Sequence, residues 1–166
     1  ELASVDRASF RREAERIIEV IEHQVGDLYQ TTCALCKKQA TVKYFLWVKQ
    51  TNCGSCGDPV DLFPGYLVAE DERHPKPVLY CPHCKNLVEV DSLDKSDIKC
   101  PSCRKVFNWK AGPAKRQRYS CRCGHEGKYQ EEMRKDGAPN HRLFGIEYHC
   151  SRCRDRSYRP MHRNGP

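Results

Sequence analysis

The chain has 166 residues, of which 39% are hydrophobic and 31% are charged. This composition is thin for one large core, so we expect several small units held by an additional stabiliser. No stretch approaches the ~18 apolar residues of a membrane span and no signal-peptide pattern is visible, which argues against a membrane protein. The chain opens with Glu1 and not with Met, so we expect a piece of a longer protein or a processed subunit.

The charge is distributed unevenly. The formal net charge is +7, but residues 105–166 hold 15 Lys and Arg against 6 Asp and Glu. Residues 1–104 hold 14 Lys and Arg against 16 Asp and Glu. The C-terminal third is therefore the end where a polyanion is expected to bind.

A helix is predicted over residues 6–28. Apolar residues at helical spacing form one stripe, which comprises Phe10, Ala14, Ile17, Ile18, Ile21, Val25 and Leu28. Asp6 or Ser9 could cap its start and Gly26 could end it. The stripe either packs on the helix's own domain or connects to a neighbour, and both interpretations stay open.

Twelve cysteines dominate the rest of the chain. Each lies in a close pair, five CxxC and one CxC: Cys33, Cys36, Cys53, Cys56, Cys81, Cys84, Cys100, Cys103, Cys121, Cys123, Cys150 and Cys153. One such turn supplies two thiolates and two turns close a tetrahedral zinc site, so we predict three structural zinc ions. Reduced, metal-bound thiolates indicate a cytosolic or nuclear compartment, and we expect a cytoplasmic protein.

Taken in chain order, the pairs form three sets. The first is Cys33, Cys36, Cys53 and Cys56; the second is Cys81, Cys84, Cys100 and Cys103; the third is Cys121, Cys123, Cys150 and Cys153. Spacings of 16 and 15 residues between pairs are typical of zinc ribbons. The predicted organisation is a helix over residues 1–30 and tandem ribbons over 31–76, 77–112 and 113–166. Interleaved pairing of the turns remains an alternative.

The fold class is thus small, metal-stabilised and mainly β, with an N-terminal amphipathic helix. The expected strands are Thr41–Lys49, Leu87–Val90 with Ile98–Lys99, and Glu126–Tyr129 with Leu143–His149. A short helix is predicted over residues 130–135, and Val60–Glu70 is expected to pair with Val78–Tyr80. Gly57, Gly124 and Asn86 suit the left-handed position of a cysteine turn. Because the cysteines already fill three sets, no histidine is expected as a ligand.

No catalytic residue is predicted. Four thiolates leave no open position on a metal, and no Walker loop, dinucleotide fingerprint, HExxH motif or Ser/His/Asp order occurs. The chain alone is therefore expected to be no enzyme and to have no small-molecule substrate. It reads as a binding or architectural module.

Two surfaces are candidates for binding. Lys43, Phe45, Trp47 and Lys49 share one face of a strand, and this face either packs under the helix or stacks nucleic-acid bases. Basic residues around the third set suit phosphate contacts, and the predicted nucleic-acid-binding residues are Lys115, Arg116, Arg118, Arg122, Arg152, Arg154, Arg156 and Arg159. We expect a nucleic acid to be the partner.

Three stretches resemble the zinc-ribbon region of large adenine-specific DNA methyltransferases: Val25-Gly-Asp-Leu-Tyr29, Tyr44-Phe-Leu-Trp-Val-Lys49 and Ile146-Glu-Tyr-His-Cys-Ser-Arg-Cys153. The resemblance implies a target-recognition segment of a restriction–modification enzyme, whose nucleic-acid partner is DNA. It also implies a partner, a catalytic domain or subunit that uses S-adenosylmethionine in the parent protein. The family's (Asp/Asn/Ser)-Pro-Pro-aromatic motif and its Gly-containing cofactor loop are absent from this chain.

Two other readings remain. The chain could be a scaffold that docks a catalytic neighbour through the helix stripe and Trp47, or a zinc-ribbon protein of the RNA-polymerase or ribosome type. The target sequence, strand preference and oligomeric state do not follow from the sequence.

Overall fold

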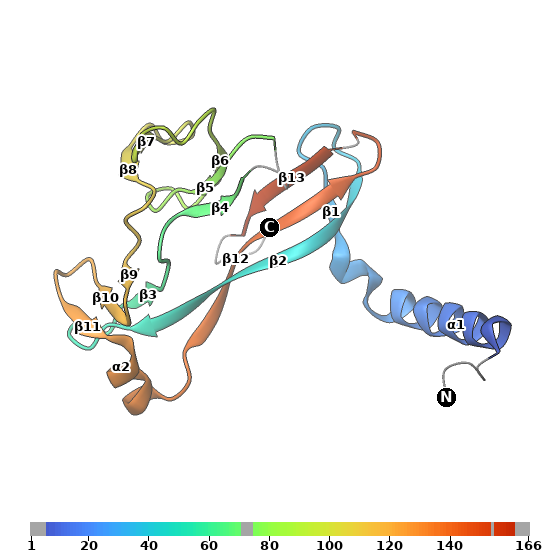
Figure 1. The fold of residues 1–166 in the computed structure, drawn as a ribbon, viewed down its shortest axis with the longest axis horizontal. Helices are drawn as coiled ribbons and strands as arrows, with labels where there is room; N and C mark the ends of the chain where they lie inside the picture. Colours follow the sequence, from blue (N-terminus) through green and yellow to red (C-terminus); the bar gives the residue numbers. More distant parts are fainter. Residues whose placement is uncertain (1–5, 71–74, 154, 162–166) are drawn as a thin grey trace. The chain divides into compact units, whose positions relative to one another are not determined.

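The computed structural model describes residues 6–70, 75–153 and 155–161 (Figure 1). The chain divides into two compact units. The first comprises the residues up to Lys43 together with Tyr148–Asp155, and the second comprises Tyr44–Glu147 and the residues from Arg156 on. These units do not coincide with the boundaries at 31–76 and 113–166 that follow from sequential cysteine sets. Within the described residues, no helix has the length and apolarity needed to cross a membrane.

Helix α1, Arg7–Val25, confirms the predicted N-terminal helix. The carboxylate of Asp6 caps it by accepting from the backbone N–H groups of Ala8 and Ser9, at 3.2 Å each. Gly26 is the C-cap, and a 3₁₀ turn, η2 (Gly26–Tyr29), follows. No residue of α1 is buried, so the structure does not pack the apolar stripe on the helix's own unit.

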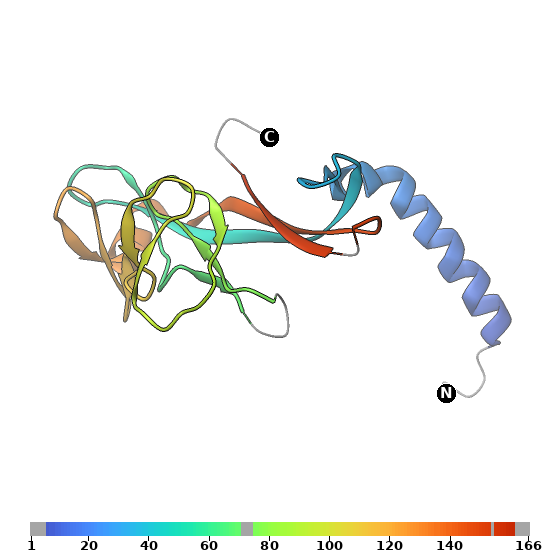
Figure 2. The same cartoon turned by 90° about the horizontal axis from the view of Figure 1, so that it is seen from above.

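Two long strands dominate the main sheet (Figure 2). Strand β2 runs over Gln39–Asn52 and β12 over Asn140–Cys150, and they are neighbours in the order β1-β2-β12-β13. The edge strands are β1, Gln30–Thr32, and β13, Asp155–Pro160. Strand β3, Pro59–Asp61, pairs antiparallel with the last residues of β2. The predicted strands Thr41–Lys49 and Leu143–His149 therefore exist, and both are longer than expected.

Three smaller sheets complete the second unit. They are β4-β5-β6 (Leu67–Ala69, Val78–Tyr80, Leu87–Glu89), β7-β8 (Asp97–Lys99, Val106–Asn108) and β9-β10-β11 (Ala114–Lys115, Arg118–Ser120, Glu126–Lys128). The pairing of β4 with β5 confirms the end of the predicted strand Val60–Glu70, whose first residues pair with β2 instead. Helix α2, Tyr129–Asp136, confirms the short helix. The expected hairpin between residues 87–90 and 98–99 is wrong, because β6 pairs with β5 and β7 with β8. Strand β11 likewise pairs with β10 and not with β12.

The buried residues form several small clusters. One surrounds Leu79 and Phe107, and a second joins Phe63, Tyr80 and Phe144. The rings of Phe63 and Tyr80 stack at 4.7 Å, and Phe144 meets Phe63 edge-on at 5.1 Å. Two further clusters are built around cysteines and one tyrosine each. Cores this small agree with the expectation that the chain needs an additional stabiliser.

Candidate metal centres and basic hairpin

The twelve cysteines form three groups of four. They are Cys33, Cys36, Cys150 and Cys153; Cys53, Cys56, Cys121 and Cys123; and Cys81, Cys84, Cys100 and Cys103. Only the last group is sequential, so the predicted first and third sets are wrong. The physical reason is strand β2, whose 14 residues extend over about 46 Å and separate Cys36 from Cys53. The interleaved pairing that the sequence left open is the observed one for these two groups.

The spacing of the sulfur atoms suits a tetrahedral ion. In the first group the Sγ–Sγ distances are 3.9 Å (Cys33–Cys153) and 3.6 Å (Cys36–Cys150). The second group has two distances of 3.7 Å and the third two of 3.8 Å. A zinc ion with Zn–S bonds of about 2.3 Å requires tetrahedral edges of about 3.8 Å, whereas a disulfide brings two sulfurs to about 2 Å. All twelve cysteines are free, and each group could hold one metal ion.

Four of the CxxC turns share one backbone arrangement. In the turn at Cys81, the Cys81 N–H donates to the carbonyl of Asn86 at 2.9 Å and the Lys85 N–H donates to the carbonyl of Cys81 at 2.8 Å. The residue after the last cysteine is left-handed in five turns: Lys37, Gly57, Lys85, Arg104 and Gly124. Gly57 and Gly124 were predicted, but Lys85 takes the position expected of Asn86. Three of the five are basic, which places positive charge beside thiolate sites.

A buried tyrosine supports each interleaved group. Tyr148 has no exposed surface, and its hydroxyl accepts from the backbone N–H of Ala34 at 3.0 Å. Tyr119 is 1% exposed, and its hydroxyl accepts from the N–H of Gly54 at 2.9 Å. Each tyrosine lies two residues before a cysteine of its group, and each contacts the turn that comes from elsewhere in the chain. Tyr-x-Cys is the sequence signal that pairs the turns, and sequence reasoning missed it.

The hydroxyl and the ring of Tyr119 both have close contacts. Its hydroxyl donates to the carboxylate of Glu132 on α2, at 3.2 Å, and Lys135 pairs with the same carboxylate. Gly127 is its direct partner across β10 and β11, and a Cβ at Gly127 would lie 2.7 Å from the tyrosine ring. Only glycine leaves room for the ring at that position. Burial raises the pKa of Tyr119 to about 12, so the hydroxyl keeps its proton at neutral pH.

Backbone N–H groups lower the pKa of one thiol in each group. The pKa of Cys53 is lowered to about 6, because the backbone N–H of Cys56 donates to its sulfur. The N–H of Cys36 lowers the pKa of Cys33 to about 7, and the N–H of Lys105 does the same for Cys103. Metal ligation needs thiolates, and the turns stabilise one of the four thiolates in each group.

The histidines that flank cysteines lie outside the metal groups. None of His83, His125 and His149 belongs to a group of possible ligands among the described residues. The imidazole Nε2 of His83 lies 3.3 Å from the carbonyl of Val106. The ring of His125 packs 6.1 Å from the ring of Tyr119.

The structure separates the predicted nucleic-acid-binding residues. Lys115, Arg116 and Arg118 lie on β9, β10 and the turn between them, in the second unit. Arg122 lies in the turn between Cys121 and Cys123 of the same unit, and Arg152 belongs to the first unit. Arg156 and Arg159 lie on β13, and Arg154 falls outside the described residues. The predicted nucleic-acid-binding residues therefore do not form one cluster around a single metal site.

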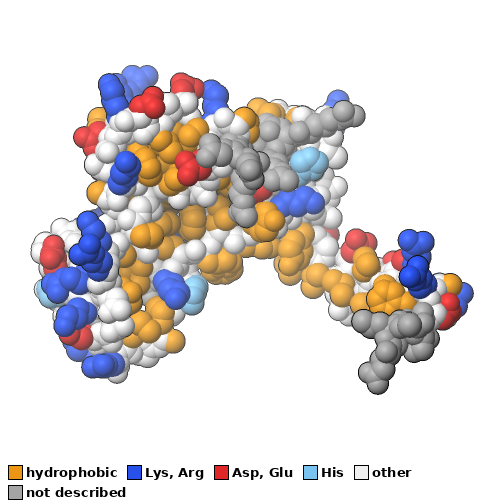
Figure 3. Space-filling model, viewed as in Figure 1, with side chains coloured by type: hydrophobic (Ala, Val, Ile, Leu, Met, Phe, Trp, Pro, Cys, Tyr) orange, Lys and Arg blue, Asp and Glu red, His pale blue; other side chains and the backbone are white. Residues whose placement is uncertain are grey.

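A row of positive side chains crosses the β9-β10-β11 sheet. Lys115 is directly opposite Arg118, and Arg118 is directly opposite Lys128. All three are exposed, and Lys and Arg side chains gather over this region (Figure 3). Lys128 was missed from the sequence because it belongs to the row only through the register of β11. We call Lys115, Arg118 and Lys128 the basic row.

The turn beside the basic row is left-handed at two residues. Arg116 has φ 46° and Gln117 has φ 67°, which are the signs required by a two-residue hairpin turn. Such turns usually use Asn or Gly, because a larger side chain is strained in this region. Strained, exposed residues concentrate at functional sites. The turn thus holds Arg116 outward at the tip of the basic row, at a cost in stability.

The outer face of β2 is open. Trp47 is 56% exposed and Lys49 is exposed, whereas Phe45 is half-buried. Within the described residues of the second unit no element covers Trp47, and the packing of this face under the N-terminal helix, which belongs to the first unit, stays a prediction. An exposed tryptophan next to lysine keeps the stacking interpretation available.

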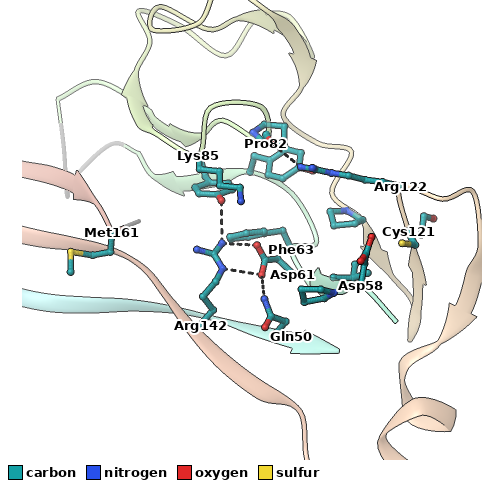
Figure 4. Close-up of a pocket in the computed structure, with 16 residues that line it drawn as sticks. Gln50, Asp58, Asp61, Phe63, Pro82, Lys85, Cys121, Arg122, Arg142 and Met161 are labelled. Carbon is teal, nitrogen blue, oxygen red and sulfur yellow. Dashed lines mark hydrogen bonds and ion pairs between the residues drawn. The ribbon is translucent and has the colours of Figure 1, made fainter. Parts of the chain in front are cut away.

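A cavity of about 510 Å³ lies between two cysteine turns of the second unit (Figure 4). At one side Arg142 holds the carboxylate of Asp61 with two hydrogen bonds, of 3.0 and 2.5 Å, and also donates to the hydroxyl of Tyr80. Burial alone would raise the pKa of Asp61, but Arg142 and the amide of Gln50 together lower it. Lys85 and Arg122 line the opposite side, and Arg122 lies within 3.4 Å of the carbonyl of Pro82.

Comparison of the chain with protein-family models, with curated proteins and with solved structures found no match in any of the three.

Proposed function

We propose that the chain is a zinc-stabilised DNA-binding module. Four thiolates fill a tetrahedral shell and leave no position for water or substrate, which favours structural ions over catalytic ones. Zinc is the ion that best fits four cysteine sulfurs at these separations. The proposed role of the ions is to supply folding energy to units whose own cores are small.

The observation that carries DNA binding is the basic row. Like charges directly opposite each other in a sheet repel and destabilise it. Only Lys128 has a described counter-ion, Glu131 at 3.3 Å, and both of these side chains are more than half exposed. A phosphate backbone lying across the row would remove the repulsion at all three positions. Arg116, at the strained tip, would extend the same contact.

The proposed contact is with phosphates. Lys and Arg bound to phosphate oxygens fix position and orientation but do not read sequence. Lys85 and Arg122 on the cavity wall lie in cysteine turns of two different groups in the same unit and offer a second pair of cations. We therefore propose that this module grips the duplex and that base recognition, where it occurs, comes from elsewhere.

The test is a titration of the zinc-loaded chain with a duplex of about 20 base pairs at several salt concentrations. Each phosphate contact contributes about 0.9 to the slope of log K against log salt. The triple variant Lys115→Ala/Arg118→Ala/Lys128→Ala should lower that slope by about 3. A matched variant with the same charge change, Lys38→Ala/Lys95→Ala/Lys99→Ala, should lower it by less than about 1. Equal losses, or no binding by the wild-type chain, would refute the proposal.

The parent protein is proposed to be an adenine-specific DNA methyltransferase. The support is the resemblance of residues 25–29, 44–49 and 146–153 to that family. In such a protein S-adenosylmethionine and the catalytic motif belong to a neighbouring domain or subunit, which is then this chain's protein partner. In the full-length protein, the triple variant should raise KM for DNA while kcat changes little, because phosphate contacts made equally in the ground state and the transition state contribute only to binding.

A scaffold role is the second candidate, favoured by the exposed Trp47 and by the exposed stripe of α1. Contiguous exposed apolar surface marks sites of protein interaction. A scaffold predicts no salt-dependent DNA binding, so the titration above separates the two functions. Trp47→Ala should then weaken the complex with the catalytic neighbour and leave the zinc content unchanged.

A further inference from the structure

The apolar stripe of α1 is exposed except at Ala14 and Val25, which are half-buried. Phe10 is 67% exposed, Ile17 is 54% and Ile21 is 50%. Hydrophobic side chains are visible along the helix in Figure 3. Apolar surface that is left open in this way is typical of a face that another molecule covers. The charges of the helix indicate which molecule that is.

The charges of α1 are ordered along its axis. Its first ten residues hold four arginines, Arg7, Arg11, Arg12 and Arg16, and two glutamates. Its last nine hold two glutamates, Glu19 and Glu22, and neither Lys nor Arg. A helix carries partial positive charge at its N-terminus and partial negative charge at its C-terminus. The order in α1 therefore opposes its own dipole and destabilises the isolated helix.

We propose that α1 pairs antiparallel with α1 of a second copy of the chain. An antiparallel partner places the arginine-rich half of one helix beside the glutamate-rich half of the other, twice. The two helix dipoles are then also antiparallel, so the unfavourable charge order of the single helix becomes favourable in the pair. A parallel pair would bring the two arginine-rich halves together and repel.

The positions of two charges fit this pairing. Arg11 and Glu22 are 11 residues apart, which is close to three full turns, so they lie on the same edge of the stripe. The midpoint between them is next to Ile17, at the centre of the stripe. In an antiparallel pair that crosses near Ile17, Arg11 of each copy is level with Glu22 of the other. Residues along the same flanking edge face each other across such a pair, so both ion pairs can form.

Sedimentation equilibrium or light scattering on the zinc-loaded full chain tests the pairing, over concentrations up to about 0.1 mM. The wild-type chain should dimerise reversibly, and Ile17→Glu should abolish dimers, because it puts two carboxylates at the apolar crossing point. Helix content by circular dichroism and three zinc ions by native mass spectrometry show that this variant is folded. A wild-type chain that stays monomeric, or dimers that persist in Ile17→Glu, overturn the proposal.

Charge reversal separates the antiparallel arrangement from every other. Arg11→Glu alone and Glu22→Arg alone should each raise the dimer dissociation constant about tenfold, because each creates two like-charge pairs. Mixing the two variants should restore dimerisation, since Glu at position 11 of one chain then meets Arg at position 22 of the other, and the remaining pair is native. Mixtures that bind no better than either variant alone would refute it. The outcome is independent of DNA binding, because neither residue belongs to the basic row.

Discussion

The sequential and interleaved metal sites differ in how much of the chain each one closes. Cys84 and Cys100 are separated by 15 residues, Cys56 and Cys121 by 64, and Cys36 and Cys150 by 113. Closing the longest of these loops costs about 2 kcal/mol more than closing the shortest, if chain entropy alone is counted. The sequential site therefore organises its own hairpins, whereas the interleaved sites join distant segments. The same ligand chemistry fixes local structure in one case and topology in the other.

The interleaved sites also carry a support that the sequential site lacks. Tyr119 and Tyr148 each bind the incoming turn through a hydroxyl, and the corresponding residue of the sequential site, two before Cys100, is Ile98. A short loop brings its two cysteine turns together at a small cost in chain entropy, so no further contact is needed. A turn that arrives from a distant segment needs a further contact to fix its orientation. The two tyrosines supply that contact.

Removal of cysteine pairs should give the largest difference between the two kinds of site. Cys33→Ser/Cys36→Ser and Cys100→Ser/Cys103→Ser should each lose one of three metal ions, and with it much of a binding free energy of about 10–16 kcal/mol. Hydrogen exchange should show loss of protection at residues 30–43 and 148–153 in the first variant. In the second, the loss should be confined to residues 77–109. Identical exchange patterns in both variants would contradict the distinction.

The ion pair of Arg142 with Asp61 should be next in size. Arg142 of β12 reaches Asp61 of β3 and Tyr80 of β5, so it links the long sheet to the region of the sequential site. Arg142→Met leaves a partly buried carboxylate without its cation and should cost about 3 kcal/mol in urea unfolding at neutral pH. Lys76→Met breaks the exposed pair with Asp91 and should cost less than about 1 kcal/mol. Equal losses of unfolding free energy in the two variants would show that the Arg142–Asp61 pair does not link these regions.

The tyrosine hydroxyls should have smaller and site-specific effects. Tyr148→Phe leaves the N–H of Ala34 without an acceptor, and Tyr119→Phe does the same for Gly54, at about 1–2 kcal/mol each. We expect about a tenfold loss of metal affinity at the adjacent site alone, in the range known for groups that orient metal ligands. Competition with a chelator, followed by native mass spectrometry, measures it. Each variant is the control for the other, because the loss is expected only at the adjacent site.

The sequence predicted the ligands but not their grouping. Twelve cysteines in close pairs identify themselves by spacing alone, and the helix and most strands follow from periodicity. Sets of 16 and 15 intervening residues look equivalent, yet only the second contains turn residues in its interior, such as Asp91 and Asp94. Residues 37–51 contain no Gly, Pro, Asn or Asp, so this stretch continues as one strand and never returns. The lack of a turn after Cys36 was the local signal that Cys36 and Cys53 do not share a site. The Tyr-x-Cys motif was the signal for pairing with a distant turn.

The binding surface was harder to predict for a different reason. Charge by segment located the basic third of the chain, and Lys115, Arg116 and Arg118 are indeed together. Lys128 is part of the basic row only because the register of β11 places it opposite Arg118. Arg152 is not part of it, because its turn carries cysteines of the other interleaved site. Pairings between distant strands and turns are decided by packing of the whole chain, and residue spacing does not contain them.

The left-handed residues of the turns should give the smallest effect, and it concerns the sequential site. Lys85 has φ 62° and Arg104 has φ 62°, both directly after a cysteine pair of that site. Lys85→Gly and Lys85→Ala remove the same charge, but alanine keeps the strain of the left-handed region and glycine does not. The glycine variant should therefore be about 1 kcal/mol more stable than the alanine variant in chemical unfolding. At Asn86, which follows the left-handed residue, the same pair of substitutions should not favour glycine. A glycine variant no more stable than alanine at position 85 would show that the turn is not strained there, and that the sequential site closes without any such cost.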